Sequence, residues 1–127
     1  MPLTPGMKGE ATTIVVHENT AASVGAGGVE VFGTPMMIAL MENAAWRAVA
    51  DALEPGSVTV GTVVNVQHLA ATPLGQRVRA IAELLEIKER RLLFHVEAFD
   101  EQQKIGEGQH ERAIVHLERF LSRLTAP

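Results

Sequence analysis

The chain has 127 residues, of which 46% are hydrophobic, 20% charged and 4% aromatic, and its formal charge is −4. This length fits one domain over residues 1–127 with the composition of a soluble globular protein. Negative charge and few aromatic side chains exclude a basic or stacking surface for nucleic acid. The absence of cysteine excludes disulfides, thiolate catalysis and sulfur-held zinc. No apolar run could cross a membrane and no signal-peptide pattern is present, so we expect a cytoplasmic protein.

The first half of the chain predicts one strand and one long helix. Residues 10–16 are rich in β-branched side chains and predict the strand. Residues 20–33 are small and glycine-rich and predict an irregular segment. We expect the helix to begin at Thr34 as its N-cap, with Pro35 at the first helical position, and to end near Leu53.

The second half predicts four strands, over residues 58–69, 77–87, 92–99 and 104–117. Short turns separate these runs, which indicates antiparallel neighbours. The preceding helix is apolar nearly all round and must be buried on most sides. A sheet that wraps around the helix would bury both, so the order of elements predicts an α+β hotdog fold.

Glu42 is the first candidate for chemistry, because it follows seven consecutive apolar residues in the expected helix. A carboxylate is rarely buried without a partner. Glu42 could turn to solvent or pair with an arginine such as Arg47. It could also be held ready for acid–base or nucleophilic chemistry, which the apolar surroundings favour.

His68 is the second candidate, and strand alternation predicts its direction. One face of its strand carries Val58, Val60, Thr62, Val64, Val66 and His68. This valine-rich face should pack on the helix, so His68 should point to the side where Glu42 lies. The alternatives are a working Glu42–His68 pair and a core-edge histidine bonded to a backbone carbonyl.

Thr34 is the third candidate. It could serve only as an N-cap, but the free N–H groups of a helix N-terminus could also stabilise an oxyanion. Gly33 would let a ligand approach the backbone closely. Eight helical residues separate Thr34 from Glu42 by about 12 Å along the helix axis, so these two residues of one chain cannot easily contact the same small carbonyl group. A two-fold dimer would bring Thr34 of one subunit toward Glu42 of the other.

The remaining histidines give weaker signals. His110 and His116 share one face of the last expected strand, but no pair has the spacing of a metal site. The glycine-rich segment lacks the residues of a phosphate loop, and no serine has a base at a motif spacing. We therefore expect neither metal nor cofactor.

Six segments in order together resemble the fluoroacetyl-CoA thioesterase family of hotdog proteins. They are VFGT (31–34), LME (40–42), LEPG (53–56), VQHLAATP (66–73), RRL (90–92) and GEGQHERA (106–113). The resemblance runs from the first strand to Phe120. It differs in one region, since residues 22–30 carry no aromatic residue ahead of Phe32, where the fluoroacetyl-specific enzyme has bulky aromatic side chains.

The resemblance implies that Thr34, Glu42 and His68 are catalytic. It also implies that Gly61 and Arg112 contact an acyl-CoA substrate, although Arg112 could instead be a surface residue paired with a neighbouring glutamate, Glu107 or Glu111.

The sequence therefore predicts a homodimeric thioesterase that hydrolyses a short- or medium-chain acyl-CoA to the free acid and CoA. Direct attack by water and a covalent intermediate both remain open, as does the pairing of dimers into tetramers. A non-catalytic hotdog module that binds an acyl thioester or small apolar ligand is the alternative. An acyl-CoA hydratase on the same fold is another.

Overall fold

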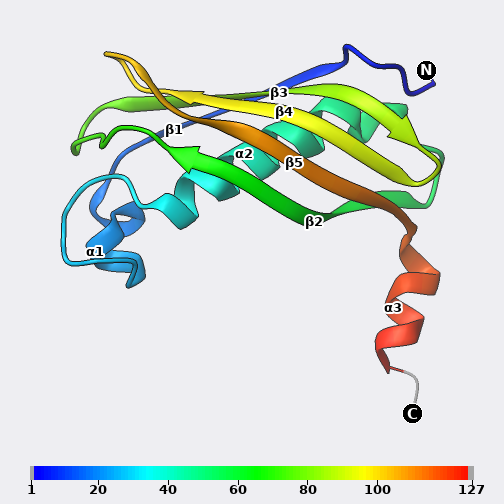
Figure 1. The fold of residues 1–127 in the computed structure, drawn as a ribbon. Helices are drawn as coiled ribbons and strands as arrows, with labels where there is room; N and C mark the ends of the chain where they lie inside the picture. Colours follow the sequence, from blue (N-terminus) through cyan, green and yellow to red (C-terminus); the bar gives the residue numbers. More distant parts are fainter. Residues whose placement is uncertain (1, 126–127) are drawn as a thin grey trace.

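A five-stranded antiparallel sheet curls around one long helix in the computed structural model, which describes residues 2–125 (Figure 1). The strands are β1 (Lys8–Ile14), β2 (Ser57–His68), β3 (Arg77–Lys88), β4 (Arg91–Phe99) and β5 (Lys104–His116), and the helix is α2 (Thr34–Val49). The order across the sheet is β1-β3-β4-β5-β2, and every neighbouring pair is antiparallel. The predicted α+β hotdog fold is confirmed.

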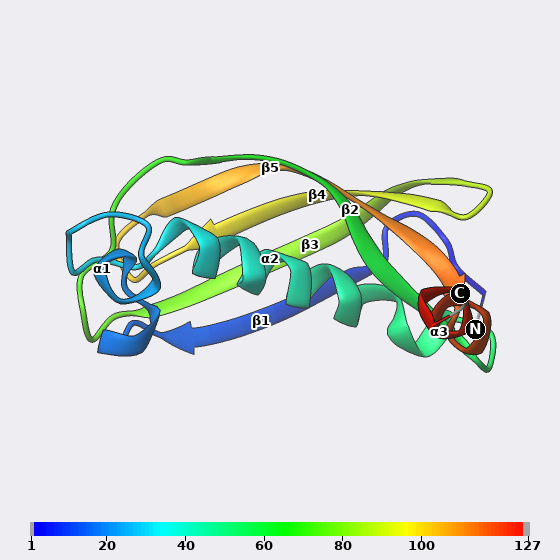
Figure 2. The same cartoon turned by 90° about the horizontal axis from the view of Figure 1, so that it is seen from below.

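The helix lies in the hollow of the sheet (Figure 2). Its buried residues, Met37, Met41, Ala44, Ala45 and Val49, face the alternating apolar residues of β3 and β4. Gly9 of β1 permits the closest approach, because a Cβ there would lie 2.1 Å from the carbonyl oxygen of Ala44. The opposite face of α2 is open in the single chain, and Trp46 there is 44% exposed.

The first helical residue of α2 differs from the prediction. Gly33 is the N-cap, in an extended conformation, and its carbonyl accepts hydrogen bonds from the N–H groups of Met36 and Met37. Thr34 therefore lies inside the first turn, and the prediction that it is the N-cap was wrong. The physical reason is that the helical hydrogen bonding already begins at the Gly33 carbonyl, and a glycine suits this position because a Cβ there would crowd the backbone of Ala21. The Thr34 hydroxyl is left free of capping.

A bulge in β2 changes which residues face the helix. The register against β5 shifts between Gly61 and Val63, so Thr62 is an extra residue. Before the bulge, Thr59 is buried on the helix side. After it, Val66 and His68 lie on that side, as predicted, but Val58 and Val60 pair with residues of the outer face. The prediction for these two valines was wrong because uninterrupted alternation fails across a bulge.

Two shorter regions also differ from the sequence pattern. Residues 20–33, expected to be irregular, contain the short helix α1 (Ala21–Val24), which follows the 3-10 turn η1 (His17–Asn19). The long helix ends at Val49 and continues as the 3-10 turn η2 (Ala50–Ala52) almost to the predicted end.

A last helix, α3 (Leu117–Thr125), was not predicted and projects from one end of the sheet (Figure 1). Its leucines recur at helical spacing but stay exposed. The β-branched run that ends β5 hides the change of period from two to about 3.6. Within residues 2–125, no helix combines the length and the apolar character that a membrane crossing requires.

Candidate active site

Thr34 and His68 meet where the N-terminus of α2 lies beside the end of β2. Thr34 Oγ1 and His68 Nδ1 share a hydrogen bond of 2.7 Å. The hydroxyl can reach the ring because Thr34 follows the N-cap and does not serve as one. A cavity of about 350 Å³ opens here, and its other walls are apolar: Ala21, Val31, Phe32, Leu69, Ala70 and Ala71.

The surroundings of His68 favour a neutral imidazole. Burial lowers the pKa of His68, and the nearby backbone of Ala70 only partly opposes this shift. The Nε2 atom is buried without a hydrogen-bond partner among residues 2–125. A neutral imidazole that hydrogen-bonds a hydroxyl can accept a proton from it or return one.

Glu42 lies on α2 in a separate ionic cluster. Its Oε2 atom is 3.3 Å from Arg112 Nη1 and 3.7 Å from His110 Nε2, and its side chain is 40% exposed. Gly61 of β2 covers this carboxylate so closely that a Cβ would stand 2.3 Å from Oε2. Glu42 is therefore paired and partly open to solvent, and it is not surrounded by apolar atoms alone.

Arg112 is a buried residue of β5, with only 7% of its surface exposed. Its Nε donates to Thr59 Oγ1 at 2.9 Å, and its Nη2 donates to the Thr59 carbonyl at 3.0 Å. Burial lowers the pKa of Arg112, and the charge of Glu42 opposes this shift. The alternative in which Arg112 is a surface residue paired with Glu107 or Glu111 was wrong, since the guanidinium points inward to Glu42.

His110 completes the cluster and was not among the predicted site residues. Its ring is buried, and its Nδ1 lies 2.7 Å from the carbonyl oxygen of Val63. Burial lowers the pKa of His110, and the positive charge of Arg112 lowers it further. The hydrogen bond to the Val63 carbonyl and the negative charge of Glu42 act in the opposite direction but do not cancel this shift. Residues 110 and 112 share one face of β5, so period-two alternation could have indicated that His110 accompanies Arg112.

The two halves of the site do not meet within one chain. No hydrogen bond or ion pair in the described part of the chain joins Glu42 to His68, and each contacts other residues. This separation agrees with the rise of about 12 Å that eight helical residues span. The imidazole nearest to Glu42 belongs to His110, not to His68.

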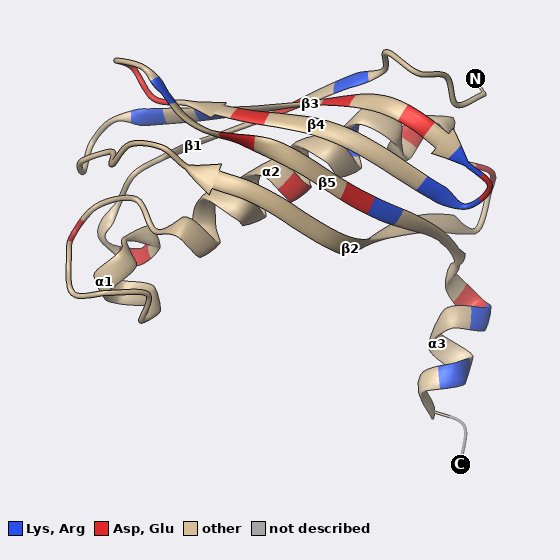
Figure 3. Ribbon diagram, viewed as in Figure 1, with Lys and Arg blue, Asp and Glu red and all other residues tan. Residues whose placement is uncertain are grey.

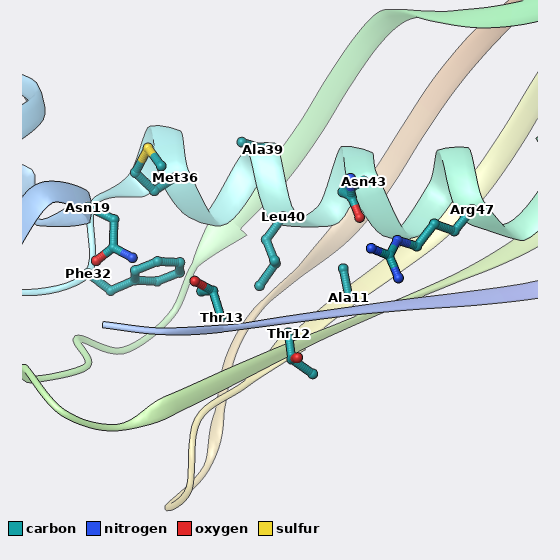
Figure 4. A pocket seen from close by; sticks show the side chains of 10 residues that line it. All are labelled: Ala11, Thr12, Thr13, Asn19, Phe32, Met36, Ala39, Leu40, Asn43 and Arg47. Atoms are coloured by element: carbon teal, nitrogen blue, oxygen red, sulfur yellow. The ribbon is translucent and has the colours of Figure 1, made fainter. Parts of the chain in front are cut away.

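A second cavity, of about 310 Å³, lies between α2 and β1 and contains none of the predicted site residues (Figure 4). Arg47 lines it, together with Asn43 and Thr13. The ion pairs of Glu42 are formed with His110 and Arg112, so Arg47, the partner that sequence spacing suggested, does not pair with it. The charged residues of α2 are Glu42 and Arg47, and others are spread along β3, β4 and β5, whereas β2 carries no Lys, Arg, Asp or Glu (Figure 3).

One group of side chains has the chemistry of a metal site. His95, Glu97 and Glu107 bring ligand atoms within 4.8 Å of one another. The ammonium of Lys104 already lies among them, 2.5 Å from Glu97 and 3.6 Å from Glu107. Its hydrogen bond to Glu97 raises the pKa of Lys104 and lowers that of Glu97. A lysine thus supplies the positive charge in this cluster.

Comparisons with known proteins agree on one family. The family model described as fluoroacetyl-CoA-specific thioesterase matches residues 15–118. The chain is 48% identical to the fluoroacetyl-CoA thioesterase of Streptantibioticus cattleyicolor over 95 residues, which cover 75% of this chain and 68% of that protein.

Solved structures give the same result. A structure of the fluoroacetyl-CoA thioesterase superposes with a TM-score of 0.91 at 38% identity and covers 100% of both chains. A thioesterase superfamily member from Thermus thermophilus superposes with a TM-score of 0.87 at 31% identity, covering 97% of this chain and 93% of its own. A hot-dog-like protein from Thermanaerovibrio acidaminovorans, at 21% identity and a TM-score of 0.85, supports the fold alone.

The family match covers most of the chain, and the sequence and structure comparisons name the same enzyme. This protein belongs to the fluoroacetyl-CoA-specific thioesterase family.

Proposed function

We propose that this protein is an acyl-CoA thioesterase that hydrolyses a short- or medium-chain acyl-CoA to the free acid and CoA. The observation that carries the proposal is the hydrogen bond of 2.7 Å between Thr34 and His68 at the N-terminus of α2. A hydroxyl bonded to a neutral imidazole is a recognised arrangement for acyl transfer. Membership of a thioesterase family supports a thioester as the substrate of this pair.

In the proposed reaction, the thioester carbonyl lies at the N-terminus of α2. Free N–H groups of the first turn stabilise the oxyanion that develops there, and the Thr34 hydroxyl stays bonded to His68. The oxygen of water or of the Glu42 carboxylate bonds to the acyl carbon as the carbon–sulfur bond breaks, and the electron pair of that bond leaves on sulfur. The CoA thiolate takes up a proton from water by way of His68, which is neutral before and after the step.

Glu42 supplies the carboxylate of the proposed site. It either takes a proton from the attacking water or attacks the acyl carbon itself. Attack by Glu42 forms a mixed anhydride, which water then hydrolyses. In a single turnover in ¹⁸O-labelled water, label in the Glu42 side chain would establish this route with water adding at the glutamyl carbonyl, whereas direct attack by water places label only in the released acid.

The cavity beside Thr34 supports a small acyl group. Its volume is about 350 Å³, and alanines make up half of the apolar wall residues. The segment of residues 22–30 places glycine and other small side chains ahead of Phe32. We therefore propose turnover of several short acyl groups, without selection for fluoroacetate by an aromatic lid.

We further propose that the working unit is a homodimer. Two surfaces support it: the open face of α2 exposes Trp46, and the unpaired edge of β2 exposes Val63 and Val64. Two-fold pairing with antiparallel α2 helices would bring Thr34 and His68 of one subunit toward Glu42 of the other. Sedimentation at several concentrations tests the dimer, and a larger species would indicate paired dimers.

Replacing Trp46 by glutamate should weaken the dimer, because the new charges would face each other across the two-fold axis. The exposed His17 replaced by glutamine serves as the control. Loss of activity in proportion to dissociation supports a site shared between subunits. A fully active monomer would contradict it.

The main test is release of free thiol from a panel of acyl-CoAs. Glu42→Gln and His68→Ala should each lower kcat by about 100-fold or more, as losses of acid–base groups do. Glu18→Gln and His17→Ala, both exposed, are matched controls.

Each alternative has its own outcome. Tight acyl-CoA binding without thiol release would favour a binding module, and hydration of enoyl-CoA without thiol release would favour a hydratase.

We also propose a cytoplasmic location, since an enzyme that acts on acyl-CoA must meet this substrate where it is metabolised. Cell fractionation tests this location.

A further inference from the structure

We propose that His110 is a positioning residue, which fixes Arg112 and through it the Glu42 carboxylate against the bulge of β2. The inference deepens the proposed thioesterase function. It rests on a continuous set of contacts that runs from the backbone of β2 to the carboxylate on α2.

The first step is the tautomer of His110. A carbonyl oxygen can only accept a hydrogen bond, so the contact of 2.7 Å with Val63 requires the proton on Nδ1. In the neutral ring, Nε2 then carries a lone pair. That atom lies 3.2 Å from Arg112 Nη1, which donates to it.

The second step is the geometry of Arg112. Its Nε and Nη2 donate to Thr59, so the plane of the guanidinium is fixed on one side. The two hydrogens of Nη1 then point to His110 Nε2 and to Glu42 Oε2, at 3.2 and 3.3 Å. His110 thus holds the same nitrogen that holds Glu42.

The third step is the backbone. Val63 is the first paired residue after the bulge, and Gly61 is the last before it. A Cβ on Gly61 would lie 3.2 Å from the His110 ring and 2.3 Å from Glu42. His110 therefore sets the position of the bulge relative to the carboxylate as well as the position of Arg112.

Burial makes this arrangement selective for a neutral ring. His110 is 1% exposed and lies between Arg112, Glu42 and the aromatic ring of Phe94, whose centroid is 6.4 Å away. A proton on Nε2 would remove the acceptor of Arg112 and place a second cation beside it. Arg112 would then lose the contact that orients Nη1.

Two near-isosteric substitutions separate the two contacts of His110. His110→Asn keeps a donor near Nδ1 for Val63 but removes the acceptor of Arg112. His110→Gln keeps an acceptor near Nε2 for Arg112. We expect His110→Asn to lower kcat for acetyl-CoA 10- to 100-fold with KM within about threefold, the scale of a misplaced catalytic group. His110→Gln should keep most of the wild-type kcat, and the control His17→Gln should leave both kcat and KM unchanged.

A purely structural role would give another pattern. Equal kcat values for the Asn and Gln variants, or losses that follow the melting temperature alone, would overturn the proposal. A readout independent of turnover is the imidazole ¹⁵N spectrum, in which wild-type His110 should show a protonated Nδ1 and an unprotonated Nε2. The opposite tautomer would overturn the contact scheme. Absence of thiol release from the wild-type protein, with this spectrum intact, would instead count against the thioesterase function.

Discussion

Gly61→Ala tests whether the position of the Glu42 carboxylate matters for turnover. The added Cβ would stand 2.3 Å from Glu42 Oε2, whereas an ordinary contact is about 3.5 Å. The carboxylate must therefore move by about 1 Å. A displacement of this size at a catalytic group costs about 100-fold in rate, or about 2.7 kcal/mol in the activation free energy.

The same substitution should change the stability little. The group that must move is the end of a half-exposed side chain, and Gly61 does not have a positive φ. Replacing glycine by alanine also lowers the entropy of the unfolded chain, which stabilises the fold by about 0.4–1 kcal/mol. We expect the melting temperature to stay within about 5 °C of the wild-type value.

Thiol release from acetyl-CoA gives kcat and KM, and a thermal melt gives stability. Gly28→Ala is the matched control, because a Cβ at Gly28 would meet no atom within 4 Å. If Gly61→Ala turned over within threefold of the wild type while keeping its fold, the tight contact with Glu42 would have no catalytic meaning. A large loss of stability would instead make the rate uninformative.

Two further predictions concern Thr34 and pH. Thr34→Val removes the hydroxyl that bonds His68 and should lower kcat about 100-fold; Thr34→Ser should keep most of it. Because Gly33 is the N-cap, the free energy of unfolding of Thr34→Val should fall by less than the value of about 1 kcal/mol that loss of a cap costs. A larger decrease in urea unfolding would contradict this. Burial lowers the pKa values of His68 and His110, so below about pH 6.5 the unfolded chain binds protons first. The free energy of unfolding should therefore be constant above that pH and fall below it, and a flat profile in urea titrations from pH 8 to 5 would refute this.

Periodicity predicted the fold well because the long elements carry strong and simple patterns. The apolar run after Thr34 and the four alternating runs became α2 and β2 to β5 with ends shifted by a few residues. The missed helix α3 is short and packs loosely, so neither its length nor its burial leaves a strong signal. Its leucines follow directly on a strand pattern.

The residues of the candidate site could be picked out in the sequence by type, but their contacts with one another could not. Thr34 and His68 stood out from their local surroundings, and the structure joins them. The partner of Glu42 comes from a strand 70 residues later, and no local spacing identifies it. Sequence neighbours such as Arg47 and Glu111 were the wrong partners for this reason, since sheet register decides which distant residues meet.

The bulge in β2 connects these observations. Gly61 and His68 are seven residues apart, so uninterrupted alternation through Thr62 would place them on opposite faces of the strand. The shift lets Gly61 cover Glu42 and lets His68 reach Thr34, both on the helix side. Deleting Thr62 would leave the two residues six apart, so a regular strand would still turn both toward α2; the bulge is how the strand accommodates Thr62 without turning either residue away. We infer that the hydrogen bond from the buried His110 to the carbonyl of Val63, just beyond the bulge, stabilises this register shift.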